Sequence, residues 1–305
     1  MQKIIGIIGP TASGKSSLGE RLARECPGEI ISCDSVQVYE GFHIGTNKPS
    51  NSIQKEIPHH LIDVVGPTDP FHAGRFVELA DQAIKEVSGR GRIPLVVGGT
   101  GLYLRALLHG LSPAPAIPSG VQETLEKEMM EGGLQPLYEE LTERDPELAS
   151  QLPPTDTQRI LRGLAVVRGT GLQLSALNRA HQFSENRYEF RLLAIPHERE
   201  VLYERINKRV QEMMEEGLLH EVESLLSQGV PRDCRPMEAP GYSQLVQFMD
   251  GKMGLDEAVA LIQQSHRRYA KRQMTWLNKT KEVEWVEGES LSIEGLQRWY
   301  SSESP

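Results

Sequence analysis

The sequence predicts an α/β fold in which a parallel sheet is flanked by helices. Three short apolar runs, at residues 3–9, 29–33 and 93–97, each lead into a glycine or an aspartate. Runs of this length without polar alternation are typical of strands that are buried on both faces. An amphipathic segment at 16–25 follows the first run. The order strand, turn, helix, strand therefore indicates a parallel sheet.

The rest of the chain divides into a continuation of this sheet and a helical insertion. A fourth strand is predicted at 190–195, and long helices at 198–216 and 256–277. The stretch 113–188 contains helical patterns broken by Gly and Pro and no convincing strand. It opens on a linker that is marked by Pro113, Pro115 and Pro118. We therefore expect an α/β core domain of residues 1–112 and 189–305, interrupted by a helical insertion domain at 113–188.

Composition and charge exclude several classes of protein. With 305 residues, 38% hydrophobic and 25% charged, the chain is typical of a globular protein. No apolar run approaches the roughly 18 residues that a membrane span needs, and no signal-peptide pattern opens the chain. The three cysteines fit neither a disulfide framework nor a zinc site, so we expect reduced thiols in the core: Cys26, Cys33 and Cys234. We expect a cytoplasmic monomer.

The most specific motif lies between the first predicted strand and helix. It fits the P-loop pattern Gly-x-x-x-x-Gly-Lys-Ser/Thr, whose backbone N–H groups surround the oxygens of a bound nucleotide's phosphates. Lys15 would bind the terminal phosphates, and the hydroxyl of Ser16 would complete the ligand shell of a Mg²⁺ ion. The motif consists of Gly9, Pro10, Thr11, Ala12, Ser13, Gly14, Lys15 and Ser16.

The P-loop alone does not identify the reaction. In an ATPase or GTPase, an apolar strand that ends in Asp holds the metal ion. The candidate strand at 93–97 runs instead into Gly98, Gly99, Thr100 and Gly101. This weighs against a hydrolytic motor or switch, and it favours a transferase in which a phosphate group leaves.

Two further strand ends carry candidate site residues. Asp34 follows the second apolar run, at the edge where open α/β sheets bind their ligands. A carboxylate there can accept a proton from an incoming nucleophile. Asp before Ser is also a common turn or capping residue, so the sequence leaves both roles open. Thr100 and its flanking glycines add a hydroxyl and bare backbone at another strand end.

Two basic segments stand out in a chain whose net charge is −9. Residues 266–281 contain six Lys or Arg, no acid, and the aromatic residues Tyr269 and Trp276. Arg159 and Arg162, near Arg168 in the insertion, share a helix face. A solvated helix face is the alternative to a functional role for either segment. Two such segments beside a phosphate-binding core favour a polyanionic partner.

Taken in order, these motifs resemble the tRNA dimethylallyltransferases, also called tRNA isopentenyltransferases, over nearly the whole chain. The P-loop is shared with many enzymes, whereas the other blocks in this order are specific. The matching blocks are Gly9–Ser16, Asp34–Tyr39, Ile44-Gly45-Thr46 with Lys48-Pro49, His59–Asp63, Gly98–Tyr103, Gln158–Arg162, Gly241-Tyr242 and Tyr269–Trp276.

The resemblance implies transfer of the dimethylallyl group from dimethylallyl diphosphate to N6 of the adenosine just 3′ of the tRNA anticodon. Asp34 would act as the base, with Lys15 and Thr100 as further catalytic residues and Mg²⁺ as cofactor. Lys271 and Arg272 would reach the diphosphate that the P-loop holds. The base is expected to leave its stack, and the anticodon stem-loop to be bound by Asp34, Ser35, Val36, Gln37, Thr100, Gln122, Gln158, Arg159, Ile160, Leu161 and Arg162.

The chain departs from the usual family pattern at Asn47, Thr155 and Pro240. Pro240 fixes φ and lacks an N–H donor, which puts the local geometry in doubt. Two alternatives remain beside the transferase. A small-molecule kinase that uses ATP would leave both basic segments idle. A non-catalytic RNA-binding or nucleotide-switch protein would not need Asp34.

Overall fold

The computed structural model describes residues 1–111, 117–181, 186–287 and 291–302. The chain forms two compact units, Met1–Leu108 with Arg187–Pro305 (the P-loop unit) and His109–Asn186 (the helical unit). The sequence placed the corresponding boundaries after 112 and 188, within a few residues of these. Two residues of the predicted linker, Pro113 and Pro115, lie outside the described residues.

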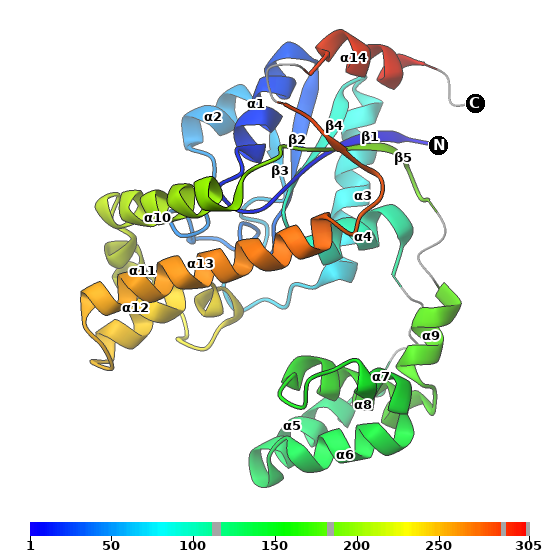
Figure 1. The fold of residues 1–305 in the computed structure, drawn as a ribbon, viewed down its shortest axis with the longest axis vertical. Helices are drawn as coiled ribbons and strands as arrows, with labels where there is room; N and C mark the ends of the chain where they lie inside the picture. Colours follow the sequence, from blue (N-terminus) through cyan, green and yellow to red (C-terminus); the bar gives the residue numbers. More distant parts are fainter. Residues whose placement is uncertain (112–116, 182–185, 288–290, 303–305) are drawn as a thin grey trace. The chain divides into compact units, whose positions relative to one another are not determined.

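A six-stranded sheet, parallel throughout, forms the centre of the P-loop unit and confirms the predicted fold class (Figure 1). The strands lie in the order β3-β2-β4-β1-β5-β6. The four predicted strands are present, and two short edge strands join them. Their bounds are β1 Lys3–Ile8, β2 Gly28–Cys33, β3 His59–His60, β4 Ile93–Gly98, β5 Glu189–Ala194 and β6 Val283–Trp285.

Both faces of the sheet are covered by helices, which explains why the central strands read as continuous apolar runs. Ile4 and Ile8 of β1 pack in one apolar cluster, and Ile5 and Ile7 pack in a second one. Alternate side chains of a strand point to opposite faces, so both faces of β1 are core. The helices of this unit are α1 Lys15–Glu25, α2 Asn51–Glu56, α3 Ala73–Gly89, α4 Gly101–His109, α10 Arg199–Glu215, α11 Leu218–Ser227, α12 Tyr242–Met249, α13 Leu255–Leu277 and α14 Ile293–Ser301, with a 3₁₀ turn η1 at Arg235–Glu238.

The adjacent histidines of β3 are structural. His60 Nε2 lies 2.7 Å from Glu29 Oε2, whereas His59 Nδ1 lies 2.7 Å from the carbonyl oxygen of Ile57. They point to different partners, as neighbouring residues of a strand do. Within the described ranges, no three His, Cys, Asp or Glu side chains form a metal site. The three cysteines are free and buried, as the sequence predicts.

The helical unit has an apolar core of its own. Its described part contains helices and no strand, as predicted: α5 Val121–Gly132, α6 Gln135–Arg144, α7 Pro146–Ser150, α8 Thr157–Thr170 and α9 Leu174–His181. Leu125, Leu141 and Leu164 are completely buried together. Gly163 lets α8 approach its neighbours, because a Cβ there would lie 2.7 Å from a Leu148 methyl group. The buried Asp145 caps α7 and accepts a hydrogen bond from the Ser175 amide at 3.0 Å.

Candidate active site

The P-loop joins the end of β1 to the first turn of α1. Gly14 adopts φ +80° immediately before the helix, and Ala12 adopts φ +62°. The Ser13 amide donates to the carbonyl of Pro10 at 3.3 Å, and His197 Nε2 lies 2.7 Å from the Ser13 carbonyl. Helix α1 thus begins at Lys15 with its free N–H groups at the loop, an arrangement that attracts phosphate.

Lys15 is held over the loop as a partly desolvated cation. Its ammonium group donates to the carbonyl of Pro10 at 3.1 Å. Burial is the largest cause that lowers the pKa of Lys15 to about 8, and the charge of Arg209 lowers it further. The charge of Asp34 acts in the opposite direction. A bound anion would restore the charged form, because an opposite charge nearby favours it.

Three neighbouring strands bring the predicted residues to one edge of the sheet. In the order β2-β4-β1, Asp34 follows β2, Thr100 follows β4, and the P-loop follows β1. The Thr100 amide donates to the carbonyl of Cys33 at 3.3 Å, which ties the first two strand ends together. The hydroxyl of Thr100 is buried and interacts with the Tyr269 hydroxyl, which opposes the rise in the pKa of Tyr269. No hydrogen bond of normal geometry satisfies the Thr100 hydroxyl in the described structure, so it can bind a substrate group.

The Asp34 carboxylate uses one oxygen locally. Its Oδ1 accepts from the amides of Val36 at 2.8 Å and of Gln37 at 3.2 Å, which forms a tight turn. No hydrogen bond from the described residues reaches the other oxygen. Asp34 can therefore serve both as a turn residue and as a catalytic base, because the turn orients the carboxylate and leaves one oxygen for a reactant.

Gln273 of α13 connects two sides of the site. Its Oε1 accepts from the Thr11 amide at 2.9 Å, and its Nε2 donates to the Gly99 carbonyl at 3.0 Å. The side chain is buried, and a Cβ on Gly99 would lie 2.2 Å from Nε2. The glycine is therefore needed for this close approach. Although Gln273 lies in a motif that we identified, its bridging role was not visible from the sequence.

Arg209 is a site residue that sequence reasoning missed. Its guanidinium donates to the Thr11 hydroxyl at 2.9 Å, and its Nε is buried without a partner in the described structure. Burial lowers its pKa, and the charge of Asp34 opposes this. In the sequence, Leu202, Ile206 and Met213 recur at helical spacing, which indicates a core-facing side of this helix. Arg209 lies on the same helical face. A cation on an otherwise apolar face is the feature of the sequence from which its role in the site could have been suspected.

The comparison with known proteins decides the family. The profile of a family described as IPP transferase matches residues 37–280, which is more than half of the chain. A second profile, described as isopentenyl transferase, matches residues 2–62. The chain belongs to the IPP transferase family.

Relatives within this family are similar over most of their length. The chain is 47% identical over 284 residues to tRNA dimethylallyltransferase 1 of Syntrophotalea carbinolica, and the alignment covers 93% of this chain and 90% of the relative. It is 46% identical over 287 residues to the enzyme of the same name from Pelobacter propionicus, with 94% and 93% covered. No helix in the described ranges is long and apolar enough to cross a membrane.

Two solved structures extend the comparison. The tRNA isopentenylpyrophosphate transferase of Staphylococcus epidermidis is 37% identical, with a TM-score of 0.69 and coverage of 98% of this chain and 97% of that one. A eukaryotic dimethylallyltransferase solved as it acts on tRNA is 26% identical, with a TM-score of 0.79 and coverage of 99% and 76%. The predicted resemblance is thus confirmed.

Among the residues that follow Asp34, Gln37 holds the loop that contains Thr46 and Asn47 in place. Gln37 accepts from the Ser32 hydroxyl at 2.8 Å, and its Nε2 donates to the carbonyls of Thr46 at 3.0 Å and Asn47 at 3.1 Å. Ser35 and Val36 are half-buried in the turn. A contact between Gln37 and a base stays a prediction, because its amide group is already engaged here.

Two of the departures from the family pattern have a clear local geometry. Asn47 adopts φ +52°, a left-handed conformation that Asn tolerates better than Ala does. Pro240 precedes Gly241, which adopts φ +102° at the start of α12. The Gly241 amide donates to Gln244 Oε1 at 2.8 Å, so the turn is well bonded despite the proline. Thr155 is exposed, and nothing in the structure explains its choice.

Lys271 and Arg272 occupy exposed positions of α13, directly before the buried Gln273. The Arg272 guanidinium lies over the Tyr269 ring, 5.5 Å from its centroid. Burial is the largest cause that raises the pKa of Tyr269 to about 12. The predicted contact of the two cations with the diphosphate stays a prediction.

The predicted RNA-binding residues of the helical unit divide into two groups. Gln122, Gln158, Arg159 and Arg162 are exposed. Ile160 and Leu161 are buried in the apolar core of this unit, so their side chains, contrary to the prediction, offer no surface to an RNA. The charge of the neighbouring Arg168 is neutralised within the unit, because its guanidinium pairs with both Glu128 and Glu140.

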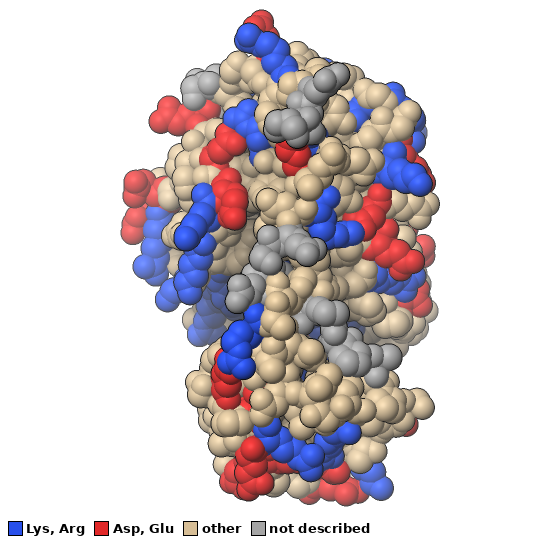
Figure 2. Space-filling view, turned by 90° about the vertical axis from the view of Figure 1, so that its right-hand side faces the viewer, with Lys and Arg blue, Asp and Glu red and all other residues tan. Residues whose placement is uncertain are grey.

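Charged side chains of both signs are interspersed over much of the face that Figure 2 shows, with several Lys and Arg gathered along its left-hand edge. The net charge of −9 therefore does not prevent local concentrations of positive charge.

Proposed function

We propose that this protein transfers the dimethylallyl group of dimethylallyl diphosphate to N6 of the adenosine just 3′ of the anticodon of a tRNA. The products are N6-dimethylallyladenosine and diphosphate. The names of its relatives support the reaction. The observation that carries the proposal is that three adjacent strand ends bring an anion-binding loop, a carboxylate and a buried hydroxyl to one edge.

The donor side of the reaction belongs to the P-loop. The loop amides and the N-terminus of α1 bind the diphosphate, and Lys15 and Arg209 add positive charge where negative charge grows as it departs. Both cations are partly desolvated, which strengthens their interaction with an anion. Gln273 fixes the loop through Thr11, so the donor meets a preformed site. Lys271 and Arg272 approach the diphosphate from α13.

The acceptor side belongs to Asp34 and Thr100. The bond from the adenine N6 to carbon 1 of the dimethylallyl group forms as the bond from that carbon to the diphosphate oxygen breaks. Asp34 accepts the proton that N6 releases, and the leaving group keeps the electron pair of the broken bond. The hydroxyl of Thr100 holds the N6 group or a phosphate oxygen. The adenine leaves its stack to reach this edge.

We propose Mg²⁺ as the cofactor. The Ser16 hydroxyl, exposed in the first turn of α1, is the hard oxygen donor that this ion prefers, and phosphate oxygens and water would supply the remaining ligands. The ion would neutralise charge on the diphosphate.

The tRNA is the macromolecular partner in this proposal. Gln122, Gln158, Arg159 and Arg162 lie exposed on α5 and α8 and would bind the anticodon stem-loop, whose unpaired bases are the usual targets of specific recognition. We propose that the protein acts in the cytoplasm as a monomer. The relatives described above are tRNA-modifying transferases, so the kinase alternative gains no support from them.

Label transfer tests the proposal. Purified protein is mixed with Mg²⁺, unmodified tRNA and radiolabelled dimethylallyl diphosphate, without ATP. We expect label in the tRNA, at the adenosine 3′ of the anticodon after nuclease digestion. Absence of label in the RNA, together with transfer of the γ-phosphate of ATP to a small acceptor, would establish the kinase alternative.

A further inference from the structure

One buried histidine of the P-loop unit has no role in the reaction described above. His266 lies on the inward face of α13, which also carries the buried Ala270 and Gln273. The residue is 8% exposed, and its Nε2 atom is buried without a hydrogen-bond partner in the described structure. Burial of a nitrogen that makes no hydrogen bond has a free-energy cost, and such atoms are rare in folded proteins. His266 is therefore a candidate for contact with a ligand.

Helix α10 places Arg209 next to this histidine. The Nη1 atom of Arg267 donates to Asn207 Oδ1 at 2.5 Å, and Gln263 Nε2 donates to the Asn207 carbonyl at 3.4 Å. His266 lies between these two residues of α13, and Arg209 follows Asn207 by two residues. Burial, followed by the positive charge of Arg209, lowers the pKa of His266 to about 4. The ring is therefore neutral at pH 7 and carries one N–H group.

Arg209 has a second buried nitrogen that no described residue satisfies. Its Nη1 atom donates to the Thr11 hydroxyl of the P-loop at 2.9 Å, whereas its Nε atom is buried without a partner in the described structure. The guanidinium is also close enough to Lys15 and Asp34 for their charges to interact with its own. It therefore lies near His266 on one side chain's account and near the P-loop on another's.

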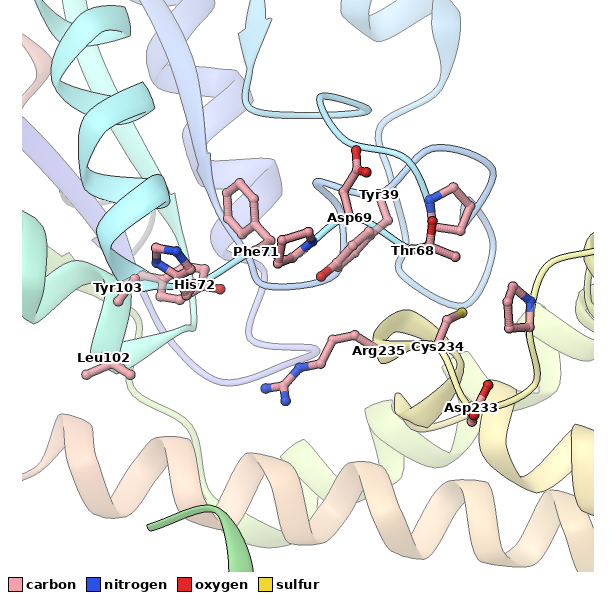
Figure 3. A pocket seen from close by; sticks show the side chains of 14 residues that line it. Tyr39, Thr68, Asp69, Phe71, His72, Leu102, Tyr103, Asp233, Cys234 and Arg235 are labelled. Atoms are coloured by element: carbon pink, nitrogen blue, oxygen red, sulfur yellow. The ribbon is translucent and has the colours of Figure 1, made fainter. Parts of the chain in front are cut away.

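The two unpartnered nitrogen atoms are separate from the cavity that Figure 3 shows. That cavity has a volume of about 590 Å³ and is lined by side chains such as Tyr39, Tyr103 and Arg235. Neither Arg209 nor His266 lines it. The P-loop, to which Arg209 is hydrogen-bonded, is the binding site that the two nitrogen atoms adjoin.

We propose that His266 is a further residue of the diphosphate site, whose Nε2–H group bonds to a phosphate oxygen that Arg209 also binds. The inference rests on the proposed function. A phosphate oxygen can accept from more than one N–H group, and it would satisfy both unpartnered nitrogen atoms. A neutral ring suits this position, because Lys15 and Arg209 are both cations and a third cation would repel them in the protein without ligand. A buried water is the alternative partner, and the test distinguishes it.

The test measures diphosphate binding with and without turnover. His266→Leu removes the N–H group and fills a similar volume, whereas His266→Gln keeps an N–H group at a similar reach. His220→Leu is the matched control, because the side chain of His220 is 87% exposed on α11 of the same unit. For each protein, isothermal titration calorimetry gives Kd of inorganic diphosphate in the presence of Mg²⁺. Label transfer gives KM of dimethylallyl diphosphate and KM of the tRNA.

We expect His266→Leu to raise both Kd of diphosphate and KM of dimethylallyl diphosphate about tenfold, as the loss of one hydrogen bond to a charged group does. KM of the tRNA should not change. Tm should stay the same or rise, because the variant no longer buries a nitrogen without a partner. His266→Gln should remain within about threefold of wild type, since it keeps the hydrogen bond, and His220→Leu should equal wild type.

A spectroscopic measurement reports the contact directly. In protein labelled with ¹⁵N-histidine, the Nε2 signal of His266 is identified as the one that His266→Gln lacks. We expect this signal to shift when inorganic diphosphate is added, because a new hydrogen bond forms at that atom.

Two results would overturn the inference. One is an unchanged Kd of diphosphate in His266→Leu with an unmoved Nε2 signal, which would assign the two nitrogen atoms to a buried water. The other is an equal loss of diphosphate binding in His266→Leu and His266→Gln with a lower Tm in both, which would reduce His266 to a packing residue. Calorimetry needs no transfer of the prenyl group. Failure of wild type to label the tRNA would instead refute the proposed function, so the two failures are distinguishable.

Discussion

The polar side chains that we propose for function are placed in opposite ways in the two units of the molecule. At the strand ends of the P-loop unit, Lys15, Arg209 and Gln273 are buried or half-buried, and each is bonded to the P-loop. In the helical unit, Arg159 and Arg162 lie exposed on α8, whose other face is completely apolar. The first arrangement fixes atoms for chemistry. The second leaves charge accessible on the surface, as the proposed binding of a large polyanion requires.

The difference teaches where a substitution should act. A buried polar group that loses its partner has a high free-energy cost and shifts its neighbours, so changes at the strand ends should alter rate constants or donor binding. An exposed cation interacts through screened charge, so changes on α8 should alter RNA affinity in a salt-dependent way. The predictions that follow test this contrast, in order of decreasing effect.

Asp34→Asn should have the largest effect. The amide oxygen can still accept from the Val36 and Gln37 amides, so the turn is retained, but no proton acceptor remains. We expect kcat for prenyl transfer to fall about 10³-fold, with RNA affinity unchanged. Single-turnover label transfer and filter binding measure the two quantities. A loss below tenfold would reduce Asp34 to a turn residue.

Gln273→Leu should affect both stability and donor binding. It leaves the buried Thr11 amide and the Gly99 carbonyl without partners, at a cost of about 3 kcal/mol in the free energy of unfolding. We expect a lower Tm and a KM for dimethylallyl diphosphate raised about tenfold. Gln264→Leu, the same change at an exposed position of α13, serves as control. Equal behaviour of the two variants would contradict the bridging role.

The pH dependence of donor binding should show whether the charged form of Lys15 binds the diphosphate. Its pKa is lowered to about 8, so the charged form prevails at pH 7 and becomes the minor form at pH 9. If the diphosphate binds the charged form, KM for the donor should rise about tenfold between these pH values. Lys15→Arg keeps its charge and should give a flat profile. A wild-type profile as flat as that of the variant would exclude this role for Lys15.

Arg162→Gln should have the smallest effect. We expect about a threefold loss of stem-loop affinity at 0.1 M salt, with kcat unchanged and the slope of log Kd against log salt reduced by about one. Arg168→Gln is the contrasting variant. Because Arg168 is engaged by Glu128 and Glu140, its loss should weaken the helical unit without reducing the slope. Identical slopes in both variants would show that α8 does not contact phosphates.

The central sheet could be predicted because the residue pattern of each strand depends on that strand's own surroundings and not on distant contacts. A strand covered on both faces must be apolar throughout, and a loop that turns around phosphate must contain glycine, so β1, β2, β4 and the P-loop could be identified. The short edge strands β3 and β6 could not. Two or three residues carry no periodicity, and their pairing depends on what lies beside them.

The site was predictable as separate pieces and not as an assembly. Asp34, Lys15 and Thr100 lie at adjacent strand ends, as the predicted order of strands and helices indicates. The bridge from the P-loop to the end of β4 depends on Gln273, which hydrogen-bonds to Thr11 across 262 positions of sequence and to Gly99. Ile160 and Leu161 were predicted to bind RNA because the family resemblance identified their whole segment of α8. Which side chains of that segment face outward is decided by the helical periodicity, and these two face the core.

The same glutamine lies near the end of the chain, so it is synthesised long after the loop that it braces. The P-loop is among the first segments that a ribosome releases, yet the group that braces it arrives only with α13. The helical unit, whose apolar core consists of its own residues, leaves the ribosome before that point. A nascent chain would thus release the whole helical unit before it could complete the phosphate-binding site.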